Sequence, residues 1–376
     1  MKRLGIALAL AGAVALLVTS CAAPSSTGSA GSSSGPVSAS ACIAAASKAV
    51  AEGSTAIEPS VPAAKVDAAK NKGKTIWYIS ATMQLETMIG FAQGVQAAAD
   101  ASGLKVKIFD GANSPAKYND GITQAVAQKA DGIILQGIDP SLVKATLATA
   151  QAAGIPTVDA MNGDPSDALQ HGISSHITVD FTQAGKLQAD YILDKAKCKA
   201  NVLQLTSSLY VALKNKTKGF NDEMTALCPT CKVDTEEVNF ADFANSVSTV
   251  VRTATQRNTS LNYVNAQDDG IAFYTQPVLA SLNSKLPMVS GNGAPANMDL
   301  IRKGESQKMD IIFPPLPYMG WVEVDRLQRA MLGMDVPASG IPQQIVDDST
   351  IKQTESAQVP KFDGYENLFL KNWNIK

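Results

Sequence analysis

The sequence predicts an α/β protein of two similar lobes, each built on a parallel sheet. Short apolar runs alternate with segments of helical period from residue 74 to about residue 332, and this alternation restarts near residue 201. Strands separated by helices of this length form right-handed βαβ units on parallel sheets. The units are too numerous for one compact sheet, so two lobes are the natural solution and a TIM barrel is the competing architecture.

The first element along the chain is a leader. Met1-Lys2-Arg3 precedes an uncharged apolar run over 4–18. This run is too short to span a bilayer as a permanent helix, and it matches the apolar region of a secretory signal. We therefore predict that residues 1–20 are a signal peptide.

Cys21 directly follows this leader in the segment VTSC (18–21). Small residues before a cysteine resemble a bacterial lipobox, in which the thiol receives a diacylglycerol, and two acyl chains anchor a protein stably. We predict lipidation of Cys21 and a position on the extracytoplasmic face of the bacterial cell membrane. An ordinary cleaved signal with an incidental cysteine is the alternative.

A polar segment separates Cys21 from the first lobe. Residues 22–40 are rich in Ser, Gly, Ala and Pro, a composition that cannot bury enough apolar area to offset its ordering entropy. We expect 21–72 to comprise the lipidated cysteine and a flexible linker, with room for a short helix over 41–52.

The alternation then supplies the elements of the lobes. In the first series, strands are expected over 75–80, 104–109, 132–136, 155–158 and 177–179. One intervening helix begins near residue 85, a second carries Ile122, Ala125 and Val126 on one face, and a third begins at Pro140 and ends at Gly154. In the second series, strands are expected over 201–205, 232–238, 261–265, 286–290 and 309–313, and a last helix over 318–332. The apolar residues within each segment recur at the spacing of a strand or of a helix.

Charge and composition limit the partners. With 32 basic and 34 acidic residues the formal net charge is −2, and no basic stripe is visible, so nucleic acid is not an expected partner. After Cys21 no second long apolar stretch occurs. The protein is therefore expected to meet the membrane through its anchor and to act as a monomer.

Four further cysteines suggest disulfides rather than a metal site. Cys42, Cys198, Cys228 and Cys231 form an even set, which allows three pairings in an oxidising compartment. Cys228 and Cys231 form a single C-x-x-C, and the two histidines lie some fifty residues upstream. A closed zinc site needs four ligands, so no metal is expected.

Several segments together resemble a known family. They are KTIWYISATMQLETMIGFAQGVQAAADASG (74–103), GANSPAKYNDGITQAVAQKADGIILQGID (111–139), AAGIPTVDA (152–160), VNFADF (238–243), VNAQDDGIAF (264–273) and MVSGNG (288–293). Over roughly 74–346 the chain resembles type I periplasmic sugar-binding proteins of the ribose- and galactose-binding kind. The resemblance implies two Rossmann-like lobes and three hinge crossings near 179–180, 313–315 and 344–346, with a ligand cleft between the lobes. The expected N-terminal lobe is 73–178 plus 315–344, the C-terminal lobe 179–314 plus 345–353, and 354–376 an extension.

Ligands of such folds bind beyond the carboxyl ends of parallel strands. The candidate ligand-binding residues therefore lie in the loops and helix starts that follow strands, and one lies at a crossing. They are Thr82, Met83, Gln84, Leu85, Thr87, Met88, Asp159, Met161, Asn162, Lys216, Phe243, Asp268, Asn292 and Phe313.

The candidate cleft departs from the ribose-binding pattern. Similar ribose binders have two phenylalanines where Thr87 and Met88 stand and an Asp-Arg pair at 161–162, and they have arginine at 216, aspartate at 292 and glutamine at 313. A hydrogen bond to a charged group contributes roughly 1.5–3 kcal/mol, so losing several argues against a simple pentose. Thioethers and aromatic rings suit a ligand with an apolar face.

The motifs for catalysis and cofactor binding do not favour an enzyme. No G-x-S-x-G is present, and GNGAPA (291–296) falls late in the chain and contains Pro295, unlike a dinucleotide fingerprint. No Walker A motif occurs, so any ATP must be hydrolysed by another subunit. We predict a lipid-anchored solute-binding protein of an ABC importer, without cofactor, that delivers a sugar or polyol to a permease with a separate ATPase. A less polar solute or a sensory role is the alternative.

Overall fold

The computed structural model describes residues 37–336, 339–351 and 362–375. The predicted signal peptide, Cys21 and the first part of the predicted linker lie outside the described residues, as does 352–361 of the C-terminal region. Within the described ranges no helix has the length and hydropathy to cross a membrane. The same ranges hold no group of His, Cys, Asp and Glu side chains that could bind a metal ion.

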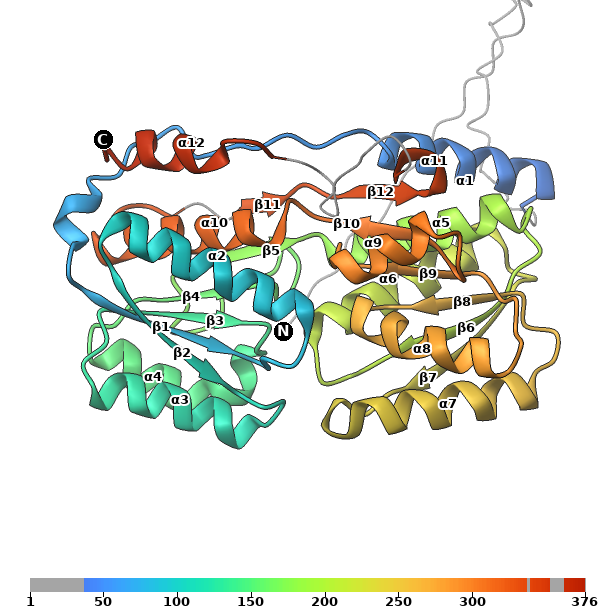
Figure 1. Cartoon of the computed structure of the whole chain (residues 1–376), viewed down its shortest axis with the longest axis horizontal. Coiled ribbons are helices and arrows are strands. Elements are labelled where there is room, and N and C mark those ends of the chain that lie inside the picture. Colours follow the sequence, from blue (N-terminus) through green and yellow to red (C-terminus); the bar gives the residue numbers. More distant parts are fainter. Residues whose placement is uncertain (1–36, 337–338, 352–361, 376) are drawn as a thin grey trace, which may run out of the picture. The chain divides into compact units, whose positions relative to one another are not determined.

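The N-terminal lobe is a parallel sheet with helices on both faces (Figure 1). Its strands are, in spatial order, β11 (Ser339–Ile341), β5 (Ser175–Val179), β4 (Thr157–Ala160), β3 (Gly132–Gln136), β1 (Thr75–Ser80) and β2 (Lys105–Asp110), and all pairs are parallel. One face is covered by α2 (Glu86–Ser102) and α10 (Leu316–Met331), the other by α3 (Pro115–Ala127), η2 (Pro140–Val143) and α4 (Lys144–Ala152). Because side chains alternate along a strand, Ile133 and Leu135 pack with the α3 layer and Ile134 with the α10 layer.

The C-terminal lobe repeats this plan. Its strand order is β12 (Gln344–Asp347), β10 (Gln307–Ile312), β9 (Met288–Gly291), β8 (Tyr263–Ala266), β6 (Asn201–Thr206) and β7 (Lys232–Glu237), and only the β10–β12 pair is antiparallel. Its helices are α5 (Phe181–Lys195), α6 (Val211–Leu227), η3 (Phe240–Asp242), α7 (Phe243–Arg257), α8 (Asp269–Ser281), α9 (Pro295–Arg302) and α11 (Asp348–Ile351). Two separate sheets exclude the TIM barrel and confirm the predicted fold class.

Three crossings join the lobes. The chain passes from β5 to α5 at Asp180, from β10 to α10 over 313–315, and from β11 to β12 over 342–343. The first two lie where they were predicted. The third lies just before the predicted 344–346, because those residues already belong to β12. Gln343 Nε2 donates to the Asp180 carbonyl at 3.1 Å, which ties the first crossing to the third.

The predicted linker is too long, because its last part is folded. Residues Ala39–Gly53 form α1, which packs against α5 and is fastened to the C-terminal lobe by a Cys42–Cys198 disulfide. The next segment passes to the N-terminal lobe (Figure 1), where Val66 N donates to the Asn372 carbonyl at 3.0 Å before η1 (Ala68–Asn71). The second disulfide joins Cys228 and Cys231.

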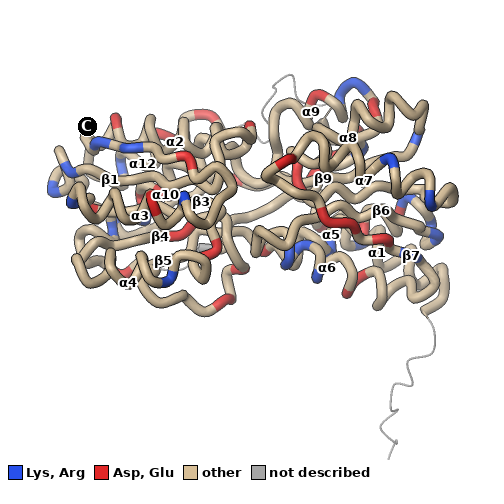
Figure 2. The backbone as a smooth tube through the Cα atoms, turned by 90° about the horizontal axis from the view of Figure 1, so that it is seen from below, with Lys and Arg blue, Asp and Glu red and all other residues tan. Residues whose placement is uncertain are grey.

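The described end of the chain belongs to the N-terminal lobe. Helix α12 (Tyr365–Asn372) packs on α10, and Trp373 stacks on Trp321 with ring centroids 5.3 Å apart. Arg329, Asp325 and the Trp373 indole join the two helices by hydrogen bonds in this buried layer. Figure 2 shows basic and acidic residues interspersed along both lobes, as expected for a chain of net charge −2.

Candidate functional site

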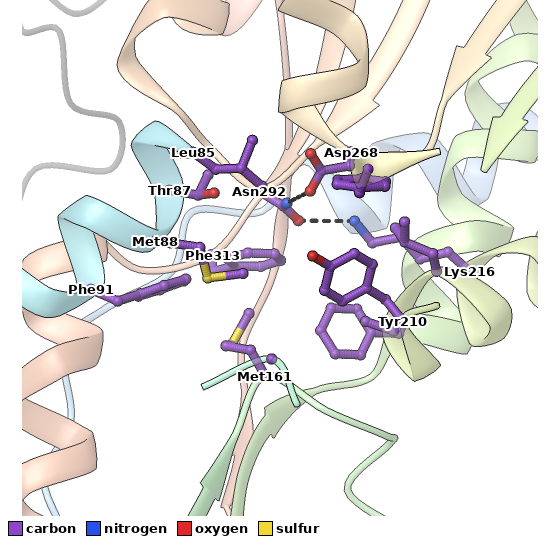
Figure 3. A pocket seen from close by; sticks show the side chains of 15 residues that line it. Leu85, Thr87, Met88, Phe91, Met161, Tyr210, Lys216, Asp268, Asn292 and Phe313 are labelled. Atoms are coloured by element: carbon purple, nitrogen blue, oxygen red, sulfur yellow. Dashed lines mark hydrogen bonds between the residues drawn. The ribbon is translucent and has the colours of Figure 1, made fainter. Parts of the chain in front are cut away.

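A cavity of about 40 Å³ lies between the lobes, at the ends of the strands (Figure 3). Its N-terminal wall is mainly apolar, whereas the C-terminal wall carries most of the polar groups. The N-terminal lobe contributes Leu85, Thr87, Met88, Phe91, Gly137 and Met161, and the crossings contribute Phe181 and Phe313. The C-terminal lobe contributes Tyr210, Ala212, Leu213, Lys216, Phe240, Asp268 and Asn292.

Helix starts direct the side chains of both walls into the cavity. Helix α2 begins at Glu86, so Thr87 and Phe91 lie four residues apart on one face of its first two turns. Helix α6 begins at Val211 and presents Ala212 and Lys216 at the same spacing. The equivalent helices of the two lobes therefore face each other across the cavity.

Two glycines hold Lys216 in place. A Cβ added at Gly185 of α5 would lie 2.0 Å from the Lys216 carbonyl oxygen, and one at Gly219 of α6 would lie 2.0 Å from the Thr182 carbonyl oxygen. Only glycine allows the two helix backbones to approach this closely. The close approach fixes Lys216 beside Phe181, the first residue of α5.

Lys216, Asn292 and Asp268 form one hydrogen-bonded network. The Lys216 Nζ atom donates to the carbonyls of Gln267 (3.0 Å) and Gly291 (3.3 Å) and to Asn292 Oδ1 (3.0 Å). An ammonium group has three donors, so protein acceptors use all of them. Asn292 Nδ2 donates to Asp268 Oδ2, and Gly270 N donates to Asp268 Oδ1 at 2.7 Å. The Asp268 carboxylate keeps spare lone pairs toward the cavity.

Burial dominates the electrostatics of this network. It lowers the pKa of Lys216, which the carboxylates of Asp268, Asp269 and Asp310 oppose. It raises the pKa of Asp268 to about 6, which the charge of Lys216 opposes. Burial also raises the pKa of both Asp269 and Asp310, whose carboxyl groups are hydrogen-bonded to each other.

The aromatic wall already holds a cation. Lys216 Nζ lies 5.6 Å from the ring centre of Phe181 and 6.0 Å from that of Phe313, within the range of a cation–π interaction. A cationic ligand at these rings would be repelled by the ammonium group. The arrangement therefore suits a neutral molecule that donates hydrogen bonds to Asp268 and packs its apolar face on the opposite wall.

The two lobes are in contact around the cavity. Tyr210 donates its hydroxyl to Asn113 Oδ1 of the N-terminal lobe. On another side Ala296 N donates to Glu86 Oε2 at 3.2 Å, and Lys214 lies 3.8 Å from Asp139. These contacts join the two lobes beside the cavity.

Eight predicted residues meet at this cavity. They come from both lobes and from the second crossing: Leu85, Thr87, Met88, Met161, Lys216, Asp268, Asn292 and Phe313. Three others occupy the turn after β1 instead. Met83 N donates to Asp110 Oδ1 at 3.0 Å, Gln84 N donates to Thr82 Oγ1 at 3.2 Å, and the Gln84 side chain is exposed.

The remaining three lie behind the lining residues. Asp159 is hydrogen-bonded to His176 Nδ1 through Oδ1, and its Oδ2 atom accepts from Asn162 Nδ2 at 3.4 Å. Burial raises the pKa of Asp159, and the bond from His176 opposes that rise. Phe243 stacks on Phe240 with centroids 4.2 Å apart, so Phe240, not Phe243, lines the cavity.

Seven lining residues were not predicted: Phe91, Gly137, Phe181, Tyr210, Ala212, Leu213 and Phe240. Two of them had a usable signal. Phe91 lies four residues after Thr87, and Phe181 directly follows the predicted first crossing. Tyr210 precedes α6 without a motif, and its place becomes clear only from its contact with Asn113.

Comparison with known proteins places the chain in a family. Residues 56–333 match the family model described as a periplasmic binding protein domain. The chain belongs to this family. Among its relatives, the ribose import binding protein of Bacillus subtilis is 22% identical over 256 residues, 68% of this chain and 80% of that protein. The one of Salmonella typhimurium is 24% identical over 246 residues, 65% and 80% of the two chains.

Solved structures share the fold of this periplasmic binding protein. A galactofuranose binding protein has a TM-score of 0.66 at 18% identity and covers 74% of this chain and 96% of its own. A Mycobacterium smegmatis ABC transporter solute binding protein with bound glycerol has a TM-score of 0.68 at 19% identity, over 77% and 100% of the two chains. The relatives bind solutes for import and are not enzymes, which confirms the prediction that this chain is not one.

Proposed function

We propose that this periplasmic binding protein captures a small neutral polyol or carbohydrate between its lobes and delivers it to an ABC permease with a separate ATPase. The observation that carries the proposal is the one-sided cavity, in which Asp268 accepts hydrogen bonds and the facing wall is apolar. Polyols and sugars carry several hydroxyl donors on one edge and C–H groups on a face. The ribose import relatives and the glycerol-bound structure support this ligand class.

The size of the cavity favours a compact ligand. A water molecule needs roughly 10–15 Å³ of such space, so about 40 Å³ admits a molecule of a few heavy atoms. A larger sugar would fit only if the flexible side chains of Met88 and Met161 moved, or if the two lobes lay further apart. Small polyols are therefore the first ligands to test.

We also propose that Cys21 is lipidated after removal of the leader, which holds the protein at the extracytoplasmic face beside its permease. The proposal rests on the VTSC segment (18–21) and the preceding apolar run. It predicts that the wild-type chain fractionates with bacterial membranes and that Cys21→Ala releases it. A Cys21→Ala variant that stays in the membrane fraction contradicts the proposal.

The ligand class can be tested by thermal shift of the protein against glycerol, erythritol, allitol, ribose and galactose, with benzyl alcohol and benzoate as nonsugar probes. Ligand at about a hundred times its Kd adds roughly 2.7 kcal/mol of stability. We expect a polyol or sugar to raise the melting temperature, and Asp268→Asn to abolish that shift. If only the nonsugar probes stabilise the protein, the carbohydrate class is wrong.

Two lysines of α6 provide a matched pair of variants. Lys216 is buried in the polar network, whereas Lys218 is exposed and pairs with Asp222. Lys216→Met should remove the donor that orients Asn292 and weaken ligand binding at least tenfold, whereas Lys218→Met should leave the affinity unchanged. Equal effects of the two substitutions would exclude a specific role for Lys216.

A further inference from the structure

A second cavity, of about 450 Å³, lies in the N-terminal lobe away from the cleft. Its walls come from α10, α12, the segment after α1 and the strand that leads into the third crossing. They are formed by residues 60–64, Tyr318, Val322, Asp325, Arg326, Arg329, Asp335, residues 340–342 and Phe369. Sites for small molecules typically have 300–1,000 Å³ and largely apolar walls with few polar groups, and this cavity fits that description.

Arg326 is the unusual member of this lining. Its side chain is only 6% exposed, yet its Nε atom has no hydrogen-bond partner among the described residues. Within that part of the chain it forms an ion pair with Asp325 alone, where Nη1 and Oδ2 are 3.5 Å apart. Buried polar groups are nearly always paired, and a buried charge without a partner is costly. The described residues therefore do not supply an acceptor for this donor of the Arg326 guanidinium group.

The nearby carboxylate cannot supply it, because Asp325 is already engaged. Arg329 donates to it through Nε at 2.9 Å and Nη2 at 3.1 Å, and Trp373 Nε1 donates at 2.8 Å. Asp335, the other acid of the lining, is exposed and forms no ion pair with Arg326. The buried part of the lining thus has two guanidinium groups and one carboxylate, an excess of one positive charge.

We propose that this cavity binds an organic monocarboxylate. The carboxylate would pair with Arg326, since a guanidinium fork matches two carboxylate oxygens, and the apolar body would pack against Tyr318, Val322, Ile341 and Phe369. An excess of one positive charge in the buried lining favours a single negative charge over a phosphate dianion. The apolar walls favour a carbon body over a bare inorganic anion.

The test is isothermal titration of the full chain with sodium benzoate, sodium butyrate, inorganic phosphate and neutral methyl benzoate. We expect benzoate to bind at least tenfold more tightly than phosphate or methyl benzoate. Arg326→Met should weaken benzoate binding at least tenfold, while Arg326→Lys, which keeps the charge, should lose less. Arg252→Met is the matched control, because Arg252 is exposed on the other lobe and bonds to Ser281, and it should bind benzoate as the wild type does.

A crystal grown with 4-iodobenzoate shows where the probe binds, independently of whether the Arg326 variants fold. An iodine anomalous peak in the cavity beside Arg326 supports the proposal. A peak in the cleft between the lobes, the absence of any peak, or equal benzoate affinity of wild type and folded Arg326→Met overturns it. None of these results bears on polyol binding in the cleft, so the two proposals fail separately.

Discussion

Replacing both cysteines of the Cys42–Cys198 disulfide should destabilise the protein far more than removing the other disulfide. The two cysteines are 156 positions apart, whereas Cys228 and Cys231 are 3 positions apart. A disulfide stabilises mainly by restricting the unfolded chain, and the effect grows with the logarithm of the closed loop. That relation gives about 5 kcal/mol for the long loop and about 2 kcal/mol for the short one.

The double variants Cys42→Ala/Cys198→Ala and Cys228→Ala/Cys231→Ala can be compared in urea by far-ultraviolet circular dichroism. We expect the first variant to lose at least twice as much free energy of unfolding as the second. The comparison is matched, because both variants replace two cysteines of the C-terminal lobe and its attached helix by alanine, and three of the four cysteines are buried.

Equal losses in the two variants would refute the loop-entropy reasoning. A small loss with an unchanged urea dependence would point elsewhere: α1 would then detach locally before the lobe unfolds. Reduction of the wild-type protein with dithiothreitol provides an independent check. Its loss should match the combined effect of the two double variants.

Three further predictions concern the cleft and the packing of α12 and Trp373 on α10. Because burial raises the pKa of Asp268 to about 6, protonation removes an acceptor for the ligand at lower pH. Polyol affinity measured by titration calorimetry should therefore fall about tenfold from pH 7.5 to pH 5, and an affinity that does not change over this range contradicts the prediction. Gly219→Ala should lower the free energy of unfolding in urea by about 1–3 kcal/mol and weaken polyol binding, because the added Cβ would meet the Thr182 carbonyl. A variant as stable as the wild type would contradict the close approach of the two helices. Trp373→Ala, which removes a fully buried ring stacked on Trp321, should lower the free energy of unfolding in urea by about 3–5 kcal/mol. A loss below about 1 kcal/mol would contradict a tight packing of α12 on α10.

The two sheets could be predicted because parallel strands that are buried on both faces appear in the sequence as short apolar runs. In β3 and β6 nearly every residue is buried, so the strands read as apolar runs between helical segments. The edge strand β7, KVDTEE, carries mixed polarity and was found mainly through its place in the alternation. A short helix over 41–52 was expected and lies within α1, but the packing of 39–72 and 362–375 against the lobes could not be predicted in the same way. Its stability depends on contacts with α5 and α10 across long stretches of the chain.

In the cleft, too, the position of a residue along the chain could be predicted, whereas its contacts with distant elements could not. Loop position after a strand was enough to find Asp268 and Asn292, because parallel strands end at one edge of the sheet. Position could not separate Phe240 from Phe243, or show that Asp159 faces His176. Those outcomes depend on which side chain points into the cavity, and neighbouring elements decide that.

The departures from the ribose-binding pattern compensate one another. An arginine at 216 would bring five donors in a planar fork and leave some for the ligand, whereas the three donors of Lys216 are all used by the protein. An aspartate at 292 could accept from Lys216 but could not also donate to Asp268, as the Asn292 amide does. Together Lys216 and Asn292 form an internal network with Asp268, whose carboxylate also lines the cavity. A solute that only accepts hydrogen bonds would find no donor in this network, so under the proposed function we expect the network to favour ligands with hydroxyl donors.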